Sequence, residues 1–222
     1  MRRFLVLVIA LVVLAGGGIA AYVLLSGDAP PPPALSQQAD ATATATATPG
    51  SEAAAWTVAA GQETYAGYRV REEFAGIGVK DAVGRTDEVT GTAQVNGETV
   101  EAAELEADMT TLVSDEARRD GALRDRGIET DRFPEATFTL TEPVRLSRQA
   151  TTAAGELTLH GQTREVDVRV SGQQLGDDAI ELAGSGPITM ADFAIEPPSV
   201  AGFVTVEDRG TLEFKLRLVP AS

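Results

Sequence analysis

Cysteine is absent from all 222 residues of the chain, and histidine occurs only once. The missing thiols exclude disulfide bonds, thiolate metal sites and a lipid-modified cysteine. Metal sites usually draw on several histidine or cysteine side chains, so this composition does not favour one. We expect no cofactor, and a fold that is held together by its apolar core.

Positive charge is also scarce. Lysine and arginine together number 18 against 33 aspartates and glutamates, which gives a formal net charge of −15 at pH 7. A surface this acidic repels phosphate backbones and anionic lipid head groups. Binding to nucleic acid is therefore not expected.

The first 25 residues have the pattern of a membrane-spanning segment. Arg2 and Arg3 precede a run from Phe4 to Leu25 that carries no charged side chain. This run is long enough to cross a bilayer core of roughly 30 Å as a helix. The two arginines predict a cytoplasmic N-terminus and place the rest of the chain outside. We expect an uncleaved signal anchor over residues 1–25; the alternative is a cleaved signal peptide, which would release a secreted protein.

Residues 26–55 have the composition of a linker. Four consecutive prolines, Pro30 to Pro33, favour an extended polyproline segment, and the following Ala-Thr repeats have few bulky apolar side chains. We therefore expect a spacer followed by one folded domain over residues 56–222.

Apolar side chains alternate with polar ones through most of that domain. In one segment Leu105, Ala107 and Met109 alternate with acidic residues, and the "GELTLHG" and "REVDVRV" segments behave alike. About eight such segments, separated by turns, predict an antiparallel all-β domain. Strands of this number can close into a barrel, whose interior is either filled by side chains or holds one small apolar ligand. The alternation is the same in both cases.

One stretch departs from this period and predicts a short helix. Ser114 is a plausible N-cap, and Gly127 stands where the helix would end. Asp115 with Arg119, and Asp120 with Arg124, are spaced for ion pairs along one helix face. We expect the charges of this helix to face water.

Catalytic chemistry is not indicated anywhere in the chain. His160 lies in "LHGQT", where we expect a turn or surface position, and the acidic row Glu104, Glu106 and Asp108 is interpreted as a solvated strand face. Neither a Gly-x-Ser-x-Gly nucleophile motif nor a phosphate-binding loop occurs. We expect no catalytic residues, no metal ligands and no enzymatic activity.

Several segments in order resemble the YceI-like family of exported bacterial polyisoprenoid-binding domains. They are Trp56 at the start of the first strand, "DEARRDGALRDRGIETDRFPEATF", "GELTLHGQTREV" and "ITMADFAIEPPS", in which Ala194 stands where the family usually has glycine. The resemblance implies an elongated, lipocalin-like antiparallel β-barrel with one short inserted helix and an apolar tunnel. The implied ligand is a polyisoprenoid or an isoprenoid quinone.

Strand parity and this resemblance together give a set of expected tunnel residues. The set comprises Tyr68, Val70, Leu105, Met109, Leu123, Phe138, Leu157, Leu159, Val166, Val168, Phe193 and Phe214, with Leu123 and Phe193 as lids. Packing into an ordinary core is the alternative for each.

The leading hypothesis is a lipid-binding protein of the bacterial cell membrane. It would cross the membrane once, keep its barrel on the extracytoplasmic side, and carry or sequester an isoprenoid lipid. Two alternatives remain open: a cell-envelope interaction module with a packed core, whose protein partner is unknown, and an enzyme that acts on the lipid.

Overall fold

A computed structural model describes residues 29–37, 53–61, 63–176, 178–197, 199–200 and 203–221. The membrane-spanning helix predicted over residues 1–25 lies outside these ranges. Among the helices within them, none combines the length and the apolar character needed to cross a bilayer.

Thirteen antiparallel strands form a single sheet in the described part of the chain. Their bounds are β1 Ala54–Val58, β2 Tyr65–Phe74, β3 Gly78–Thr86, β4 Val89–Asn96, β5 Thr99–Asp108, β6 Val113–Ser114, β7 Glu135–Leu140, β8 Val144–Arg145, β9 Thr151–Leu159, β10 Gln162–Leu175, β11 Ala179–Thr189, β12 Ser199–Val200 and β13 Val204–Pro220.

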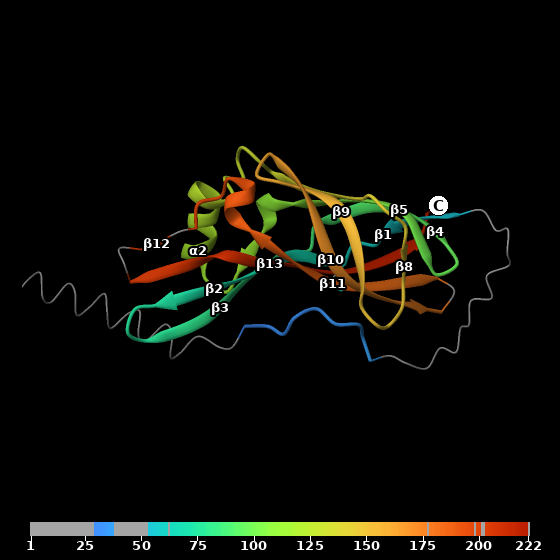
Figure 1. Cartoon of the computed structure of the whole chain (residues 1–222), viewed down its shortest axis with the longest axis horizontal. Coiled ribbons are helices and arrows are strands. Elements are labelled where there is room, and N and C mark those ends of the chain that lie inside the picture. The colour runs from blue at the N-terminus through green and yellow to red at the C-terminus, as the bar shows by residue number, and fades with distance from the viewer. Residues whose placement is uncertain are drawn as a thin grey trace, which may run out of the picture.

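The sheet closes on itself because β1 pairs with strands on both of its sides. It joins β4 through Trp56 opposite Ala93, and it joins β13 through Trp56 opposite Pro220. Eight strands thus form a ring in the order β1, β4, β5, β7, β9, β10, β11 and β13. The first part of β13 instead pairs with β2, which continues to β3 and β6. The predicted antiparallel barrel is confirmed, and its long strands give it an elongated shape (Figure 1).

The alternation in the sequence sets which side chains point inward. Leu157 and Leu159 of β9 are buried while Glu156 is exposed. On β10, Val168 is buried and its neighbour Asp167 is exposed. Successive side chains of a strand point to opposite faces, so each such strand gives one apolar face to the interior.

The predicted helix is present but begins later and ends differently. Helix α2 spans Ala117–Ala122 and passes directly into a π-helical turn, η2, at Leu123–Gly127. There the Ile128 N–H donates to the Leu123 carbonyl over 2.8 Å. Ser114 is not the N-cap; it ends β6, and its hydroxyl accepts a hydrogen bond from the Glu116 N–H. Two 3₁₀ turns, η1 Met109–Thr111 and η3 Met190–Phe193, are the other helical elements within the described ranges.

The β1 end of the barrel is filled by side chains. Trp56 is 9% exposed and faces Ala93 across the strand pair, and Leu218, which faces Ile180, is 1% exposed. We call this region the packed end. The opposite region, below α2 and η3, contains a cavity described in the next section, and we call it the hollow end (Figure 1).

Residues 29–37, which fall within the predicted linker, lie along the outer wall of the barrel (Figure 1). Arg69 and Arg85 donate to the carbonyls of Pro30 and Pro31, over 2.7 and 3.1 Å. Further along, Ser36 donates from its backbone and its hydroxyl to the Glu181 carboxylate, each over 2.9 Å. This part of the proline segment therefore packs on the folded domain.

Candidate ligand cavity

The hollow end of the barrel contains a partly open cavity of about 160 Å³ whose wall is almost entirely apolar. Its wall is built mainly by β2, β5, β7, β9 and β13, and by α2 with η2. Helix α2 and turn η2 thus form one side of the cavity, where α2 contributes Arg119 and η2 contributes Leu123 and Gly127.

Ten of the twelve residues expected in a tunnel lie in this wall. They are Tyr68, Val70, Leu105, Met109, Leu123, Phe138, Leu157, Leu159, Val168 and Phe214. Val166 and Phe193 do not line the cavity. Val166 is half-buried on β10 and packs against the core, and Phe193 is fully buried at 1% exposure. Whether the ten contact a ligand stays a prediction.

Small side chains from separate strands make room for the cavity. Ala66, Ala107 and Ala136 come from β2, β5 and β7, and all three lie in the wall. A larger side chain at any of them would occupy part of the space. The cavity therefore depends on several strands together, which explains why no single segment of the sequence predicts it.

Three aromatic rings of the wall are seated on glycines of neighbouring strands. A Cβ atom placed on Gly84 would lie 2.4 Å from the Tyr68 ring, and one on Gly155 would lie 2.2 Å from the Phe138 ring. Gly184 stands in the same relation to the Phe214 ring, at 2.3 Å. Real side chains never approach so closely, so each ring depends on the missing Cβ. Glycine inside a strand often marks such a close approach.

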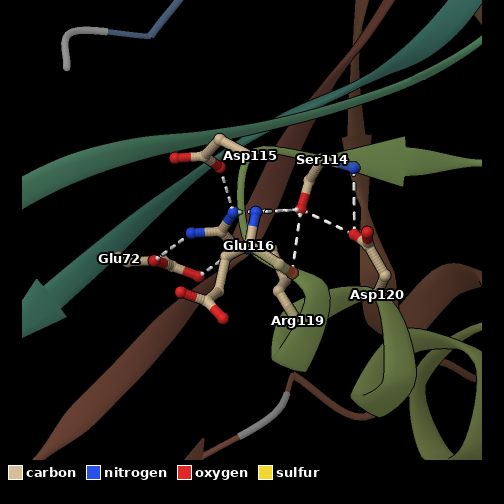
Figure 2. Close-up of polar contacts among 6 residues, drawn as sticks. All are labelled: Glu72, Ser114, Asp115, Glu116, Arg119 and Asp120. Carbon is tan, nitrogen blue, oxygen red and sulfur yellow. Dashed lines mark hydrogen bonds and ion pairs between the residues drawn. The ribbon is translucent and has the colours of Figure 1, made fainter. Parts of the chain in front are cut away.

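Two charged side chains that sequence reasoning missed also line the cavity. Glu72 follows Tyr68 and Val70 on the inward face of β2, and it is only 8% exposed. Arg119 of α2 binds it through two hydrogen bonds of 3.0 Å each (Figure 2). The expectation that the helix charges face water is wrong for Arg119, because burial of Glu72 in the barrel requires a cationic partner.

Charged side chains at the start of this helix form a local network (Figure 2). The predicted ion pair between Asp115 and Arg119 is present. Asp120 does not match its prediction, because its carboxylate accepts from the Ser114 N–H and hydroxyl over 2.9 and 2.6 Å. Its predicted partner, Arg124, is exposed. The network fixes the start of α2 against the end of β6.

The Tyr68 hydroxyl is buried close to this network. Within the described ranges, no atom forms a hydrogen bond with its oxygen. Burial raises the pKa of Tyr68 far above its usual value, and the Arg119 charge opposes this only in part. The phenol therefore keeps its proton and remains a hydrogen-bond donor at any physiological pH.

His160 takes the predicted turn position between β9 and β10 but is not a surface side chain. It is 9% exposed, and its two ring nitrogens lie 3.0 Å from the Phe193 carbonyl and 3.1 Å from a Glu129 carboxylate oxygen. Both partners are acceptors, so both bonds form together only when each ring nitrogen carries a proton. The bond from His160 lowers the pKa of the Glu129 carboxyl. His160 thereby connects the segment after η2 with η3, and both flank the cavity.

The chain is similar in sequence to several known proteins. The family model of the YceI-like domain matches residues 56–218. A UPF0312 protein of Vibrio cholerae (strain El Tor Inaba N16961) is 29% identical over 109 residues. That match covers 46% of this chain and 58% of the relative, so the chain spans under two thirds of the length of the relative.

Two solved structures share the fold. A polyisoprenoid-binding domain from Saccharophagus degradans, implicated in plant cell wall breakdown, aligns with a TM-score of 0.57 at 17% identity, over 76% of this chain and 99% of that domain. Burkholderia cenocepacia BcnA aligns with a TM-score of 0.55 at 15% identity, over 68% of this chain and 95% of its own. At these identities the likeness concerns the fold.

Proposed function

Because the chain belongs to the YceI-like domain family, we propose that its barrel binds the chain of an isoprenoid lipid, such as a polyprenol or an isoprenoid quinone. We further propose that residues 1–25 anchor the protein in the bacterial cell membrane and that the barrel acts outside the cytoplasm as a carrier or sequestering domain, without catalysis. The polyisoprenoid-binding domain of S. degradans, which has the same fold, supports the ligand class.

The observation that carries the proposal is the apolar wall of the cavity. Water in a cavity needs two to four polar partners, and this wall offers few: apart from Tyr68, its polar lining residues are Glu72, Glu106, Arg119 and Thr137. Cavities lined by aliphatic and aromatic side chains favour apolar guests. A hydrocarbon chain with few polar atoms fits that requirement.

The size of the cavity limits what it holds in this conformation. At about 160 Å³ it resembles an engineered cavity of ~150 Å³ that binds benzene. This space accommodates one or two five-carbon isoprene units. A longer chain requires the cavity to widen, which would have to displace half-buried side chains of the wall such as Leu105, Leu123 and Phe138.

Affinity for such a lipid has to come from fit rather than from dehydration. Burying a methylene group from water gains about 0.8 kcal/mol, but a chain that comes from a bilayer is already out of water. An anchor in the same membrane would offset this by raising the effective concentration of the barrel near its lipid.

The test compares the full chain with a variant whose cavity is filled. Ala107→Leu places a larger side chain in the cavity wall while keeping the strand pattern. Both proteins would be purified in the same mild detergent and extracted with organic solvent, and the extracts analysed by mass spectrometry. We expect an isoprenoid lipid in stoichiometric amount with the wild type and its loss from the variant.

The same experiment discriminates between the alternatives. If the wild type is empty, and stays empty when it is offered polyprenols and quinones, lipid binding is refuted and the interaction module becomes the better hypothesis. If an extracted lipid is chemically changed on incubation with the wild type but not with Ala107→Leu, the protein is an enzyme.

A further inference from the structure

The charged pair in the cavity wall bears on the head group of the lipid. Glu72 is the last cavity residue of β2 on the α2 side, and it stands opposite Val206 of β13, which also lines the cavity. Arg119 covers it from α2. The apolar wall therefore contains a buried ion pair, toward which the oxygen atoms of an otherwise apolar ligand would be directed.

Among the side chains that the structure describes, the charge of this region is negative despite the arginine. Around Arg119 stand the carboxylates of Glu72, Asp115, Glu116 and Asp120 (Figure 2). Lys80 lies opposite Glu72 on β3 and adds a second cation. Among the described side chains of this cluster, four carboxylates and two cations leave a formal charge of −2 (2 − 4).

A phosphate placed here would meet like charge. Arg119 is already held by both Glu72 oxygens and by Asp115, so these bonds would have to break before it could neutralise a phosphate. Repulsion between like charges is strong where water is excluded. An uncharged head group does not experience this repulsion.

Tyr68 supplies a matching donor. Its ring is part of the cavity wall. Its hydroxyl is buried, and no described residue accepts a hydrogen bond from it. A buried polar group without a partner is unfavourable, so a ligand oxygen that accepts this hydrogen bond gains by relieving it. A carbonyl or an alcohol oxygen can do so without bringing charge.

We propose that the cavity selects an isoprenoid lipid with an uncharged, oxygen-bearing head group, and that the Glu72–Arg119 pair and its acidic neighbours exclude the phosphorylated form. This inference rests on the proposed lipid-binding function. The shared chemistry of the accepted ligands is one hydrogen-bond-accepting oxygen at the end of an isoprenoid chain, which a quinone or an isoprenoid alcohol provides.

The experiment measures binding of three probes to the full chain in detergent: geranylgeraniol, geranylgeranyl phosphate and a quinone with a four-unit isoprenoid tail. We expect the wild type to bind the alcohol or the quinone at least about tenfold more tightly than the phosphate, from charge repulsion at partly buried sites. The separate alcohol and quinone arms show which head group is the better ligand.

Two variants identify the residues responsible. Glu72→Gln removes one negative charge and loosens Arg119. It should therefore raise the affinity for geranylgeranyl phosphate and reduce the preference for the neutral probes over the phosphate. Tyr68→Phe should weaken the neutral ligands by about three- to tenfold, as expected for one lost hydrogen bond. Glu73→Gln makes the same charge change at an exposed position of β2 and should leave every affinity unchanged.

Each result has a distinct meaning. Tighter binding of the phosphate than of both neutral probes by the wild type overturns this inference and leaves lipid binding intact, as does an equal effect of Glu72→Gln and Glu73→Gln. Failure of all three probes to bind refutes the proposed function itself. The ratio of the wild-type affinities for the neutral and phosphorylated probes tests the inference even if Glu72→Gln does not fold.

Discussion

The packed end and the hollow end of this barrel are built from the same alternating strands, and several strands run through both. At the packed end Trp56 and Leu218 fill the interior. At the hollow end Ala66, Ala107 and Ala136 leave space, and a helical segment closes the side. The comparison teaches that one hydrophobic pattern supports two interiors, and that the size of the inward side chains decides between them.

The largest expected difference between the two ends concerns truncated leucines. Leu218→Ala at the packed end should cost about 2–5 kcal/mol of unfolding free energy, because it opens a void in a closed core. Leu105→Ala at the hollow end should cost only about 1–2 kcal/mol, because its half-buried side chain already borders the cavity. Urea unfolding of both variants measures the difference. Equal losses would show that the cavity wall is packed as tightly as the core.

Enlarged alanines should separate the two ends in the same direction, with the larger loss of stability again at the packed end. Ala93→Leu beside Trp56 overfills the packed end and should cost about 1–3 kcal/mol. Ala107→Leu has room at the hollow end, so its stability should stay within about 1 kcal/mol of the wild type. Thermal and urea unfolding check this. A comparable loss at both positions would mean that the cavity cannot accept added volume.

The smallest expected effect concerns buried charge on the outer wall near the packed end. Burial raises the pKa of Glu181, but hydrogen bonds from Lys215, Gln173 and Ser36 outweigh it and leave the pKa lowered. A lowered pKa stabilises the fold above the usual carboxyl value of 4.5, and this contribution is lost as the pH falls through the lowered value.

The measurement is stability as a function of pH. Glu181→Gln should lower the unfolding free energy at pH 7 by about 1 kcal/mol and flatten its fall below pH 4.5. Glu207→Gln serves as a control, because Glu207 is an exposed side chain of β13. If stability falls below pH 4.5 equally in Glu181→Gln and in the wild type, the contacts of residues 29–37 with Glu181 do not contribute to stability.

Much of the fold could be predicted because it depends on local patterns. Alternation in the "GELTLHG" and "REVDVRV" segments identifies their inward residues without reference to the rest of the chain. The spacing of Asp115 and Arg119 likewise predicts their ion pair. The barrel and most of the cavity wall follow from such signals together with the family motifs.

Other features depend on residues that are distant in the sequence. Glu72 was within reach of sequence reasoning, since it continues the inward series of Tyr68 and Val70, but its partner Arg119 lies 47 positions away on a helix. The cavity requires three alanines of different strands to meet. The packing of residues 29–37 depends on contacts with Arg69, Arg85 and Glu181, whose side chains are unremarkable in the sequence.

The glycines beneath the aromatic rings influence the width of the cavity although they do not line it. Gly84, Gly155 and Gly184 are absent from the wall, yet each sets how far a ring of the wall stands from its strand. A change from glycine to alanine would push that ring toward the centre and narrow the bore. Ligand preference in such barrels can therefore diverge during evolution while every lining residue stays the same, and a designer could retune it from the neighbouring strand.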